Sequence, residues 1–413
     1  MKHSAELFNV LPPDEALQRL LSRLAPIHRF DLVSLTDALD RVTALDLVSP
    51  VDLPSFARST MDGFGVIAAS THGASESIPA YLKLLGEMPM GRATTIRVAK
   101  GEAARVHTGS MLPLDGDAVV MVEDTEELSD GSIEVRRPVA SGENVLQPGE
   151  DVCKGDAVFR AGHRLRPQDI GALAALGITD VQTYARPVVA ILSTGDEVVY
   201  PEAEPHPGQV RDINSYTASA LVTRAGGLPR LLGIVPDDYP LLEHTAREGL
   251  ARADALIISA GSSVSTRDMT ARAITALGEP GVLVHGVSLK PGKPTILAVV
   301  DGKPVFGLPG NPVSAFVVFQ LFVAPAIRLL GGARADDLQN TTQARLARNI
   351  ASVAGREDYV PVRLDHRDGE LWATPVLGKS NLIFTLVHAN GLVKIPLDIQ
   401  GLRSGEIVTV QLM

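Results

Sequence analysis

The sequence predicts a mixed, multidomain protein whose central part is a three-layer α/β domain, with a parallel sheet between two layers of helices. Three observations support this fold class. The chain has 413 residues, of which 45% are hydrophobic and 21% charged, enough for two to four domains with their own cores. Between residues 181 and 331, apolar runs of strand length alternate with amphipathic segments of helix length. The flanking regions carry short apolar runs between glycines and prolines, which are typical of β-rich domains.

The N-terminal part of the chain is expected to form a small helical domain that is interrupted by an insert. Pro13 begins a stripe of leucines at helical spacing, and the run LTDALDRV is expected to form a second helix. Helical sequence returns at Pro167, with Gly177 just beyond its end. The β-rich sequence between these helices is therefore an insert. We expect a first domain over residues 1–52 and 146–180 and a β-rich second domain over 53–145.

The third domain, expected over residues 181–331, contains the clearest strands of the sequence, VVAILS, LLGIV, DALIIS and KPVFGL. In an open parallel sheet, ligands bind beyond the carboxyl ends of the strands. The loops at those ends are TGDE, PDD, AGSSVSTRD and PGNP, so we expect the functional site among them. The remaining residues, 332–413, carry short strand-like runs and are expected to form a separate β domain.

Composition and charge narrow the classes of function. Lys and Arg (38) are outnumbered by Asp and Glu (48), and a net charge of −10 disfavours a nucleic-acid surface. The single cysteine, Cys153, permits no intrachain disulfide. The N-terminus lacks the pattern of a signal peptide, and the most apolar stretch, VSAFVVFQLFVAPAI, is expected to be a buried helix too short to span a membrane. We expect a cytoplasmic protein without nucleic-acid or membrane partners.

Two neighbouring motifs predict an anion site. Lys290 and Lys293 lie within KPGKP, where prolines restrict the backbone and two ammonium groups favour phosphate or another oxyanion. In LPGNPVS, Asn311 is the expected N-cap of a helix and Pro312 its first residue, which leaves backbone N–H groups pointing out of the helix end. The simpler alternatives are a solvated basic turn and a capped loop without a ligand.

Acidic side chains follow the same strands. Asp196 and Glu197 lie at one strand end, and Asp237, Asp238 and Asp268 are expected on the same rim of the sheet. Carboxylates beside a phosphate site commonly hold Mg²⁺, which prefers oxygen ligands. Helix capping is the alternative role, and it suits Asp238 best.

Six motifs, in this order, resemble one known family: PSFARSTMDGFGV, RVHTGSMLPLDGDAVVMVED, STGDEVV, GSSVSTRD, KPGKP and LPGNPVSA. The family is that of the molybdopterin molybdenumtransferases, which includes MoeA and the gephyrin E domain. The likeness covers nearly the whole chain, and several motifs in fixed order are more specific than any one alone. The resemblance implies an elongated homodimer in which the third domain binds a pterin and the last domain is a β-barrel.

The function that this resemblance implies is insertion of molybdate into adenylated molybdopterin, with Mg²⁺-dependent release of AMP. A molybdopterin adenylyltransferase would supply the substrate. By motif, Asp62 and Thr108 would reach into the partner subunit's cleft. Catalytic roles would also fall to Glu197, Asp237, Asp268, Lys290 and Lys293, with Glu197 and Asp268 as the metal ligands. The residues implied to bind the pterin and its phosphates are Thr194, Gly195, Asp196, Gly261, Ser263, Pro309, Gly310, Asn311, Pro312 and Ser314.

One loop departs from the family pattern and keeps other functions open. The family reads Gly-Gly-Val-Ser-Val-Gly-Asp/Glu where this chain reads AGSSVST, with Ala260, Ser262, Ser265 and Thr266 at the changed positions. A methyl at Ala260 would hinder a close or left-handed backbone, and Thr266 cannot ligate a metal as a carboxylate does. A non-catalytic, pterin-binding or scaffold protein is therefore the alternative. A nucleotide-dependent phosphotransferase is a third, which the absence of a glycine-rich loop ending in Gly-Lys-Ser/Thr disfavours.

Overall fold

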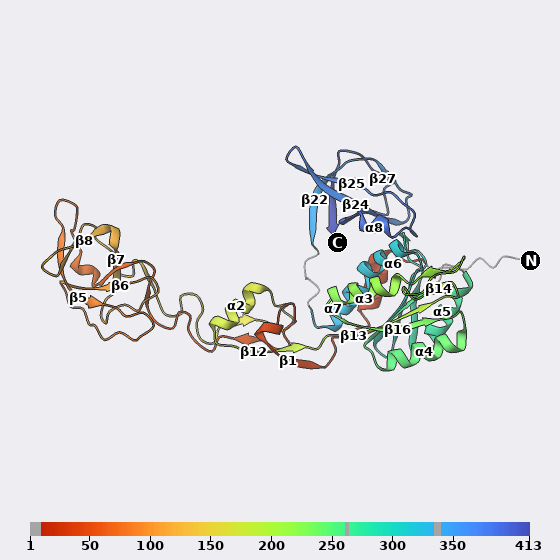
Figure 1. Ribbon diagram of the computed structural model, residues 1–413, viewed down its shortest axis with the longest axis horizontal. Helices are drawn as coiled ribbons and strands as arrows, with labels where there is room; N and C mark the ends of the chain where they lie inside the picture. The colour runs from red at the N-terminus through yellow and green to blue at the C-terminus, as the bar shows by residue number, and fades with distance from the viewer. Residues whose placement is uncertain (1–9, 261–263, 334–339) are drawn as a thin grey trace, which may run out of the picture.

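The protein consists of several domains arranged in a row, as Figure 1 shows. The structure is a computed structural model that describes residues 10–260, 264–333 and 340–413. A β-rich domain lies at one end. A small domain joins it to an α/β domain, and a C-terminal barrel is stacked on the α/β domain. The predicted mixed, multidomain fold is confirmed.

The α/β domain is built on a six-stranded sheet with the order β16-β13-β17-β21-β20-β18. The predicted parallel sheet is confirmed for the first four strands. The fifth strand, β20, runs antiparallel to its neighbours β21 and β18, so β18 again has the direction of the first four. The apolar run after KPGKP forms β20, because Asp301 and Gly302, both with positive φ, make a tight turn that returns the chain as β21. The strands are β13 (Val188–Thr194), β16 (Leu228–Val235), β17 (Ala255–Ser259), β18 (Pro280–His285), β20 (Ile296–Val300) and β21 (Lys303–Leu308).

Helices cover both faces of this sheet, as the three-layer prediction requires. One core contains side chains of α3 (Asn214–Arg224) and of the apolar helix that follows β21. The opposite core contains side chains of α4 (Tyr239–Ala251) and α5 (Val264–Leu277). The first helix, α1 (Pro13–Leu21), also packs on the first face, with Ala16 and Leu20 fully buried there. The N-terminal helix thus contributes to the α/β core, although it precedes the segments of the small domain.

The apolar helix after β21 is a core helix. It is continuous over Pro312–Leu330 as α6 (Pro312–Val318), a π-helical turn η4 (Phe319–Val323) and α7 (Ala324–Leu330). Pro325 cannot donate a backbone hydrogen bond, and the wider turn before it accommodates the ring. By length and composition this helix could cross a membrane, so the expectation that it is too short was wrong. The expectation of burial is confirmed, because every residue of α6 is buried.

In the small domain, the chain runs from the α/β domain toward the β-rich domain and later returns alongside the same path. Each outgoing segment pairs antiparallel with a returning one, in the pairs β1–β12, β2–β11 and β3–β10. The insert is carried at the end of this double ribbon, which explains the distance between the β-rich domain and the α/β domain in Figure 1. The elements are β1 (Phe30–Ser34), β2 (Leu47–Val48), β3 (Arg58–Ser59), β10 (Val145–Leu146), β11 (Ala157–Phe159), α2 (Pro167–Ala175) and β12 (Asp180–Tyr184).

The helix expected over LTDALDRV does not form. The chain makes a single 3₁₀ turn, η1 (Leu35–Asp37), and Asp40 then adopts a positive φ of 62° that no helix permits. The Ser34 hydroxyl bonds to Thr36 and Asp37 side chains at 2.7 and 3.0 Å. Such local side-chain bonds favour a turn over a helix.

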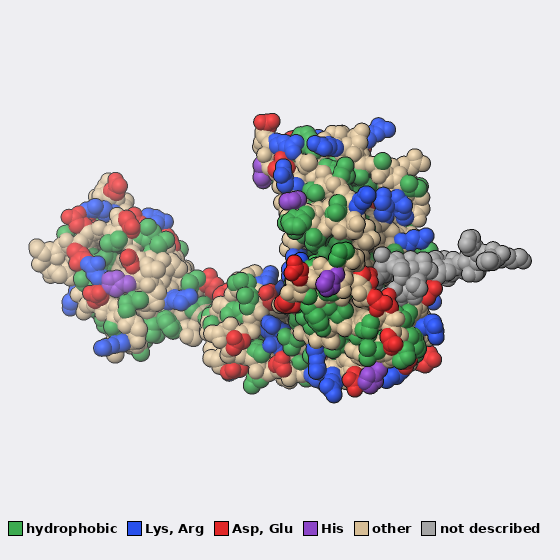
Figure 2. All heavy atoms as spheres, turned by 45° about the vertical axis from the view of Figure 1, so that its right-hand side comes forward, with side chains coloured by type: hydrophobic (Ala, Val, Ile, Leu, Met, Phe, Trp, Pro, Cys, Tyr) green, Lys and Arg blue, Asp and Glu red, His purple; other side chains and the backbone are tan. Residues whose placement is uncertain are grey.

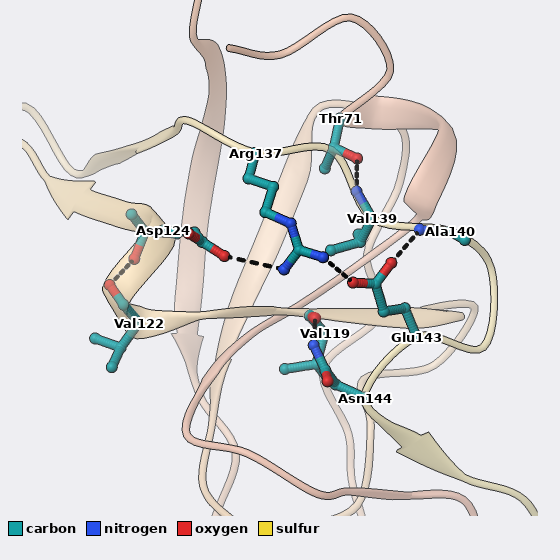
Figure 3. A network of polar contacts seen from close by, with 10 residues as sticks. Thr71, Val119, Val122, Asp124, Arg137, Val139, Ala140, Glu143 and Asn144 are labelled. Atoms are coloured by element: carbon teal, nitrogen blue, oxygen red, sulfur yellow. Dashed lines mark hydrogen bonds and ion pairs between the residues drawn. The ribbon is translucent and has the colours of Figure 1, made fainter. Parts of the chain in front are cut away.

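The β-rich domain is a six-stranded mixed sheet with the order β7-β4-β6-β5-β9-β8. Figure 3 shows how polar side chains tie its loops together. Arg137 bonds to Glu143 at 2.9 Å and to Asp124 at 3.4 Å, and Thr71 accepts a hydrogen bond from the backbone N–H of Val139 at 3.0 Å. These contacts pair the charges and link the loops of the domain. The elements are β4 (Gly63–Val66), η2 (Ala68–Ser70), β5 (Ala80–Glu87), β6 (Glu102–Val106), β7 (Ala118–Met121), η3 (Val122–Asp124), β8 (Thr125–Glu127) and β9 (Ser132–Val135).

The C-terminal domain is a closed five-stranded barrel, because β24 pairs with both β25 and β26 and the remaining strands complete the ring. The α/β domain adds β19 (Leu289–Lys290) to it as a short parallel strand beside β24. The barrel that the resemblance implied is thus confirmed. The elements are β22 (Thr341–Leu346), β23 (Ile350–Ala351), β24 (Glu357–Arg367), β25 (Glu370–Pro375), α8 (Phe384–Val387), β26 (Gly391–Ile395), β27 (Gly401–Leu402) and β28 (Ile407–Leu412).

A buried carboxylate stabilises the small domain. Asp169 on α2 is only 3% exposed. Its carboxylate accepts bonds of 2.9 Å from the Arg166 side chain and backbone, and lies 2.7 Å from the His163 ring. Burial opposes ionisation, but the bonds from Arg166 and His163 outweigh it and lower the pKa of Asp169 to about 2.

This pKa predicts how stability depends on pH. The folded-state pKa lies below the ordinary value of about 4, so the carboxylate contributes stability above about pH 4 and loses it as the pH falls toward 2. We expect Asp169→Asn to lower the free energy of unfolding by about 2 kcal/mol at pH 7. The difference from wild type should shrink between pH 4 and pH 2 in calorimetric melts. The control is Asp151→Asn at an exposed carboxylate, and an equal loss in both variants would contradict the prediction.

Candidate active site

Two adjoining cavities lie at the carboxyl edge of the parallel strands. The register aligns Ser193 with Ser259, and Ser259 with Leu308, so the loops after these strands meet at one edge. A cleft of about 1110 Å³ lies between this edge and the barrel. A smaller cavity of about 380 Å³ lies over the strand ends. Both are lined by Gly310, Asn311 and Asn381, so the two cavities form one composite site.

The KPGKP loop is fixed on the wall of the larger cleft. Thr295 donates its hydroxyl to the Gly292 carbonyl at 2.6 Å, and the backbone N–H of Val287 donates to the Lys293 carbonyl at 3.0 Å. Gly292 has a φ of +121°, and a Cβ there would lie 2.7 Å from Val318 on α6. The loop therefore needs glycine at this position, and its close packing against α6 gives Lys290 and Lys293 a fixed backbone.

Basic side chains from two domains line the larger cleft. Lys290 and Lys293 come from the α/β domain, and Arg356 and Lys379 from the barrel. Asp358 is the one acidic residue among the described lining residues. Figure 2 shows Lys and Arg side chains on the barrel beside the α/β domain. Four cations against one carboxylate give this cleft a local positive charge in an acidic protein, which favours an oxyanion.

The N-terminal end of α6 was expected to offer its backbone N–H groups to an anion, but it contacts the barrel instead. Asn311 is the N-cap, but it makes no side-chain cap bond and donates instead to the Ser380 hydroxyl at 3.1 Å. The backbone N–H of Val313 donates to the Ser380 carbonyl at 3.1 Å. Since Pro312 has no N–H, this helix end is partly occupied by the barrel loop. Ser314 is buried and lines the larger cleft.

Polar side chains line the smaller cavity. Asp212 is 7% exposed and accepts hydrogen bonds from the hydroxyls of Ser193 at 2.7 Å and Ser215 at 2.5 Å. Asn214 donates its amide to the Gly310 carbonyl at 2.8 Å, which fixes the orientation of the amide because a carbonyl can only accept. The amide of Asn214 also donates to the Ser259 hydroxyl at 3.0 Å. These contacts fix the polar groups of the cavity floor beside the acidic rim.

The predicted acidic residues of the loops after β13 and β16 lie close together. Glu197 is half-buried and lines the smaller cavity. The Asp196 carboxylate accepts from the backbone N–H of Asp237 at 3.1 Å, and Thr194 donates its hydroxyl to the Asp237 carboxylate at 3.3 Å. Asp238 accepts from the N–H of Leu241 at 2.9 Å, so its capping role is confirmed.

A complete protein metal site is absent from the described residues, among which no three His, Cys, Asp or Glu side chains come close enough to hold an ion. Asp268, the second predicted metal ligand, is an exposed residue of α5. The candidate donors are all carboxylate oxygens, which Mg²⁺ prefers, and Mg²⁺ is commonly bound by one or two carboxylates together with substrate phosphates. The carboxylates of Glu197 and Asp268 are thus of the kind that Mg²⁺ prefers, but only Glu197 lines one of the two cavities.

Asp62 and Thr108 lie far from these cavities within one chain. They belong to the β-rich domain, which Figure 1 places at the opposite end of the molecule. Asp62 accepts from the backbone N–H of Thr108 at 2.7 Å and from its hydroxyl at 3.0 Å. These two bonds lower the pKa of Asp62, so its carboxylate is held ionised at an exposed turn.

The altered loop is only partly described. Gly261, Ser262 and Ser263 lie outside the described residues, as do the side chains of Ser265 and Thr266. Ala260 lines the smaller cavity and is not among the residues with positive φ. A left-handed backbone, the first reason to expect harm from the extra methyl, is therefore not required at this position.

Sequence reasoning missed the residues that the barrel brings to the site. Arg356, Asp358, Lys379 and Ser380 carry no periodic or motif signal, and only the pairing of β19 with β24 places them beside KPGKP. Asp212 and Asn214 were also missed. The run DINS at the start of α3 is a cap-like pattern that would have singled out Asp212, whose carboxylate accepts from the N–H of Ser215 at 3.1 Å.

Family profiles match three successive parts of the chain. The "MoeA N-terminal region (domain I and II)" matches residues 11–177. The "Probable molybdopterin binding domain" matches residues 190–329, and the "MoeA C-terminal region (domain IV)" matches residues 343–413.

Individual proteins are similar over almost their full length. A molybdopterin biosynthesis protein of Methanocaldococcus jannaschii is 36% identical over 407 residues, which are 97% of this chain and 95% of that protein. The molybdopterin molybdenumtransferase of Bacillus subtilis is 31% identical, and the alignment covers 98% of this chain and 94% of that protein. The crystal structure of a molybdopterin biosynthesis MoeA protein from Pyrococcus horikoshii OT3 is 33% identical, with a TM-score of 0.86 over 98% of this chain and 100% of that one.

A glycine substitution tests the placement of Glu197. Gly195 has a φ of +145°, and a Cβ there would lie 2.7 Å from the Glu197 carboxylate and 3.0 Å from Val198. We expect Gly195→Ala to displace Glu197 and to cost about 1–2 kcal/mol from backbone strain alone. Gly208→Ala is the matched control, because Gly208 also has a positive φ, of +96°, but has open space around it. Gly195→Ala should therefore melt at a lower temperature than Gly208→Ala, and equal melting temperatures would contradict the predicted contact.

Proposed function

Because the chain belongs to the MoeA family, we propose that it inserts molybdate into adenylated molybdopterin and releases AMP. Its relatives over the full length are named as transferases, and the chain is accordingly a transferase of molybdenum cofactor biosynthesis. One observation supports the finer proposal above all. A cleft lined by four cations adjoins a smaller cavity with an acidic rim, so one site offers places for oxyanions, phosphates and a metal ion.

The larger cleft suits the anionic parts of these substrates. Molybdate is a tetrahedral dianion, and the adenylated pterin carries phosphates. Lys290 and Lys293 offer ammonium groups, and Arg356 offers a planar fork of donors that can bind two oxygens at once. These residues would neutralise the charge of the bound oxyanions and hold molybdate near the phosphorylated end of the pterin.

The smaller cavity and its rim suit the remaining groups. Its volume of about 380 Å³ and its fixed amide and hydroxyl groups are of the kind that orients a small heterocycle. Glu197 and Asp268 would hold Mg²⁺ together with substrate phosphates, and the bound ion would supply charge neutralisation for phosphoanhydride cleavage. Thr194 and Asp196 would keep Asp237 oriented at the same rim through their contacts with it.

A homodimer completes this proposal. Asp62 and Thr108 have the predicted catalytic motif but lie at the far end of the subunit from the cavities. Apolar side chains are exposed on the small domain, among them Leu32, which is 75% exposed, and Phe30, which is 47% exposed. Such side chains favour burial against a second subunit. A second copy would then bring its β-rich domain toward the cavities of the first.

A non-catalytic, pterin-binding or scaffold protein of the same fold is the second candidate. The observation that favours it is Thr266, which stands where the family has a carboxylate. In either role we expect a cytoplasmic protein that receives its pterin from a molybdopterin adenylyltransferase.

A turnover assay distinguishes the two candidates. We expect the purified protein, incubated with adenylated molybdopterin and Mg²⁺, to release AMP much faster when molybdate is added. Tight binding of the pterin without AMP release would contradict the transferase proposal and support the non-catalytic alternative.

Glu197→Ala tests the proposed role of the acidic rim in the same assay. We expect a loss of turnover of at least about a hundredfold, because one missing charge-stabilising group commonly has an effect of this size. The melting temperature should stay unchanged, since Glu197 lies on a loop rim. Glu202→Ala is the matched control at an exposed carboxylate in the same connection between β13 and α3, and it should retain activity.

A further inference from the structure

We propose that Asp358 is a positioning residue whose buried carboxylate holds Lys290 and Arg356 side by side as one oxyanion-binding pair. The inference rests on the proposed function for the identity of the oxyanion, molybdate. It adds a residue of the barrel that acts through its two cationic partners and does not itself contact the substrate.

The contacts of Asp358 define this arrangement. One carboxylate oxygen lies 2.9 Å from Arg356 Nε, and the other lies 3.6 Å from Lys290 Nζ. The Asp358 side chain is 4% exposed, whereas those of Lys290 and Arg356 are 57% and 36% exposed. A buried anion thus anchors two partly exposed cations, and all three residues line the cleft.

The backbone fixes the same arrangement across two domains. Lys290 on β19 is the register partner of Asp358 on β24, and Leu289 is the partner of Glu357. The backbone N–H of Glu357 donates to the Ser288 carbonyl at 2.8 Å. Because Lys290 belongs to the α/β domain and Arg356 to the barrel, one carboxylate sets the spacing of two cations that the sequence separates by 66 positions, from 290 to 356.

Charge and position predict opposite results when this carboxylate is neutralised. The larger cleft is lined by four cations and Asp358, so its formal charge is +3 and would rise to +4 without the carboxylate. If charge alone governed affinity, an oxyanion would bind more tightly. If Asp358 positions the cations, its loss leaves Lys290 and Arg356 free to turn toward solvent. Binding an oxyanion then carries the entropic cost of ordering two long side chains. We expect the second effect to prevail.

The neighbouring residue provides a matched comparison. Glu357 is also buried, with a side chain that is 4% exposed, but it does not line the cleft. Successive residues of a strand point to opposite faces, and Glu357 bonds to Lys394 at 2.7 Å and to the Tyr359 hydroxyl at 3.0 Å. Burial and the charge of Glu357 raise the pKa of Tyr359, so this phenol stays protonated. Glu357 therefore has the same charge as Asp358 and a similar burial, but its role is structural.

The test measures oxyanion affinity directly. Molybdate and, separately, sulfate are titrated calorimetrically into the full-length protein and into Asp358→Asn, whose folding is checked by its circular dichroism and melting temperature. We expect Asp358→Asn to bind molybdate about tenfold more weakly, equivalent to about 1.4 kcal/mol. In turnover, KM for molybdate should rise by a similar factor, while kcat at saturating molybdate stays within about twofold.

The controls separate positioning from loss of structure. Glu357→Gln should leave oxyanion affinity and KM within about twofold, even where it lowers the melting temperature. Asp358→Glu keeps the charge and is used instead of Asp358→Asn if that variant does not fold. We expect it to lower oxyanion affinity about threefold, because the longer side chain displaces both cations. Unchanged or tighter binding in the folded variant, an equal loss in Glu357→Gln, or a wild type that binds neither oxyanion would overturn the proposal. Oxyanion binding without AMP release would overturn only the proposed function.

Discussion

The architecture of the site depends on one short strand pairing. β19, at the start of the KPGKP loop, joins β24 of the barrel and thereby ties the α/β domain to the C-terminal domain. This pairing forms the wall of the larger cleft and brings Arg356 and Asp358 beside Lys290. A second link joins Asn311 and Val313, at the start of α6, to Ser380 of the barrel. The composite site therefore needs both domains in register, and neither domain alone presents the cation cluster.

The double ribbon of the small domain sets a second constraint. Because every outgoing segment pairs with a returning one, the β-rich insert is held away from the α/β core, and its Asp62–Thr108 turn lies far from the cavities of the same chain. The exposed apolar side chains along this ribbon, such as Leu32, give a physical reason for a second subunit. The proposed dimer and the proposed division of the catalytic residues between two copies thus have the same structural origin.

Local patterns predicted those parts of the molecule that local interactions determine. Hydrophobic periodicity located the parallel strands and the helices that begin at Pro13 and Pro167, and the strand-end rule located the rim with Glu197. Side-chain competition replaced the helix expected in LTDALDRV with a turn at Asp40. The cations of the barrel could not be predicted, because Arg356 and Lys379 reach the site only through a pairing between segments distant in sequence. The hydrogen bond from the backbone N–H of Val313, at the start of α6, to the Ser380 carbonyl could not be predicted either, because these residues are also distant in sequence.

The central claim, that the cleft between the α/β domain and the barrel is the oxyanion site, is most directly tested by locating a heavy oxyanion. Tungstate has the shape and charge of molybdate, and its anomalous scattering identifies its position in crystals of the protein. We predict tungstate within about 3 Å of the donor nitrogens of Lys290 and Arg356, the distance of a charge-assisted hydrogen bond. Tungstate bound only elsewhere on the molecule, with this cleft unchanged, would contradict the account.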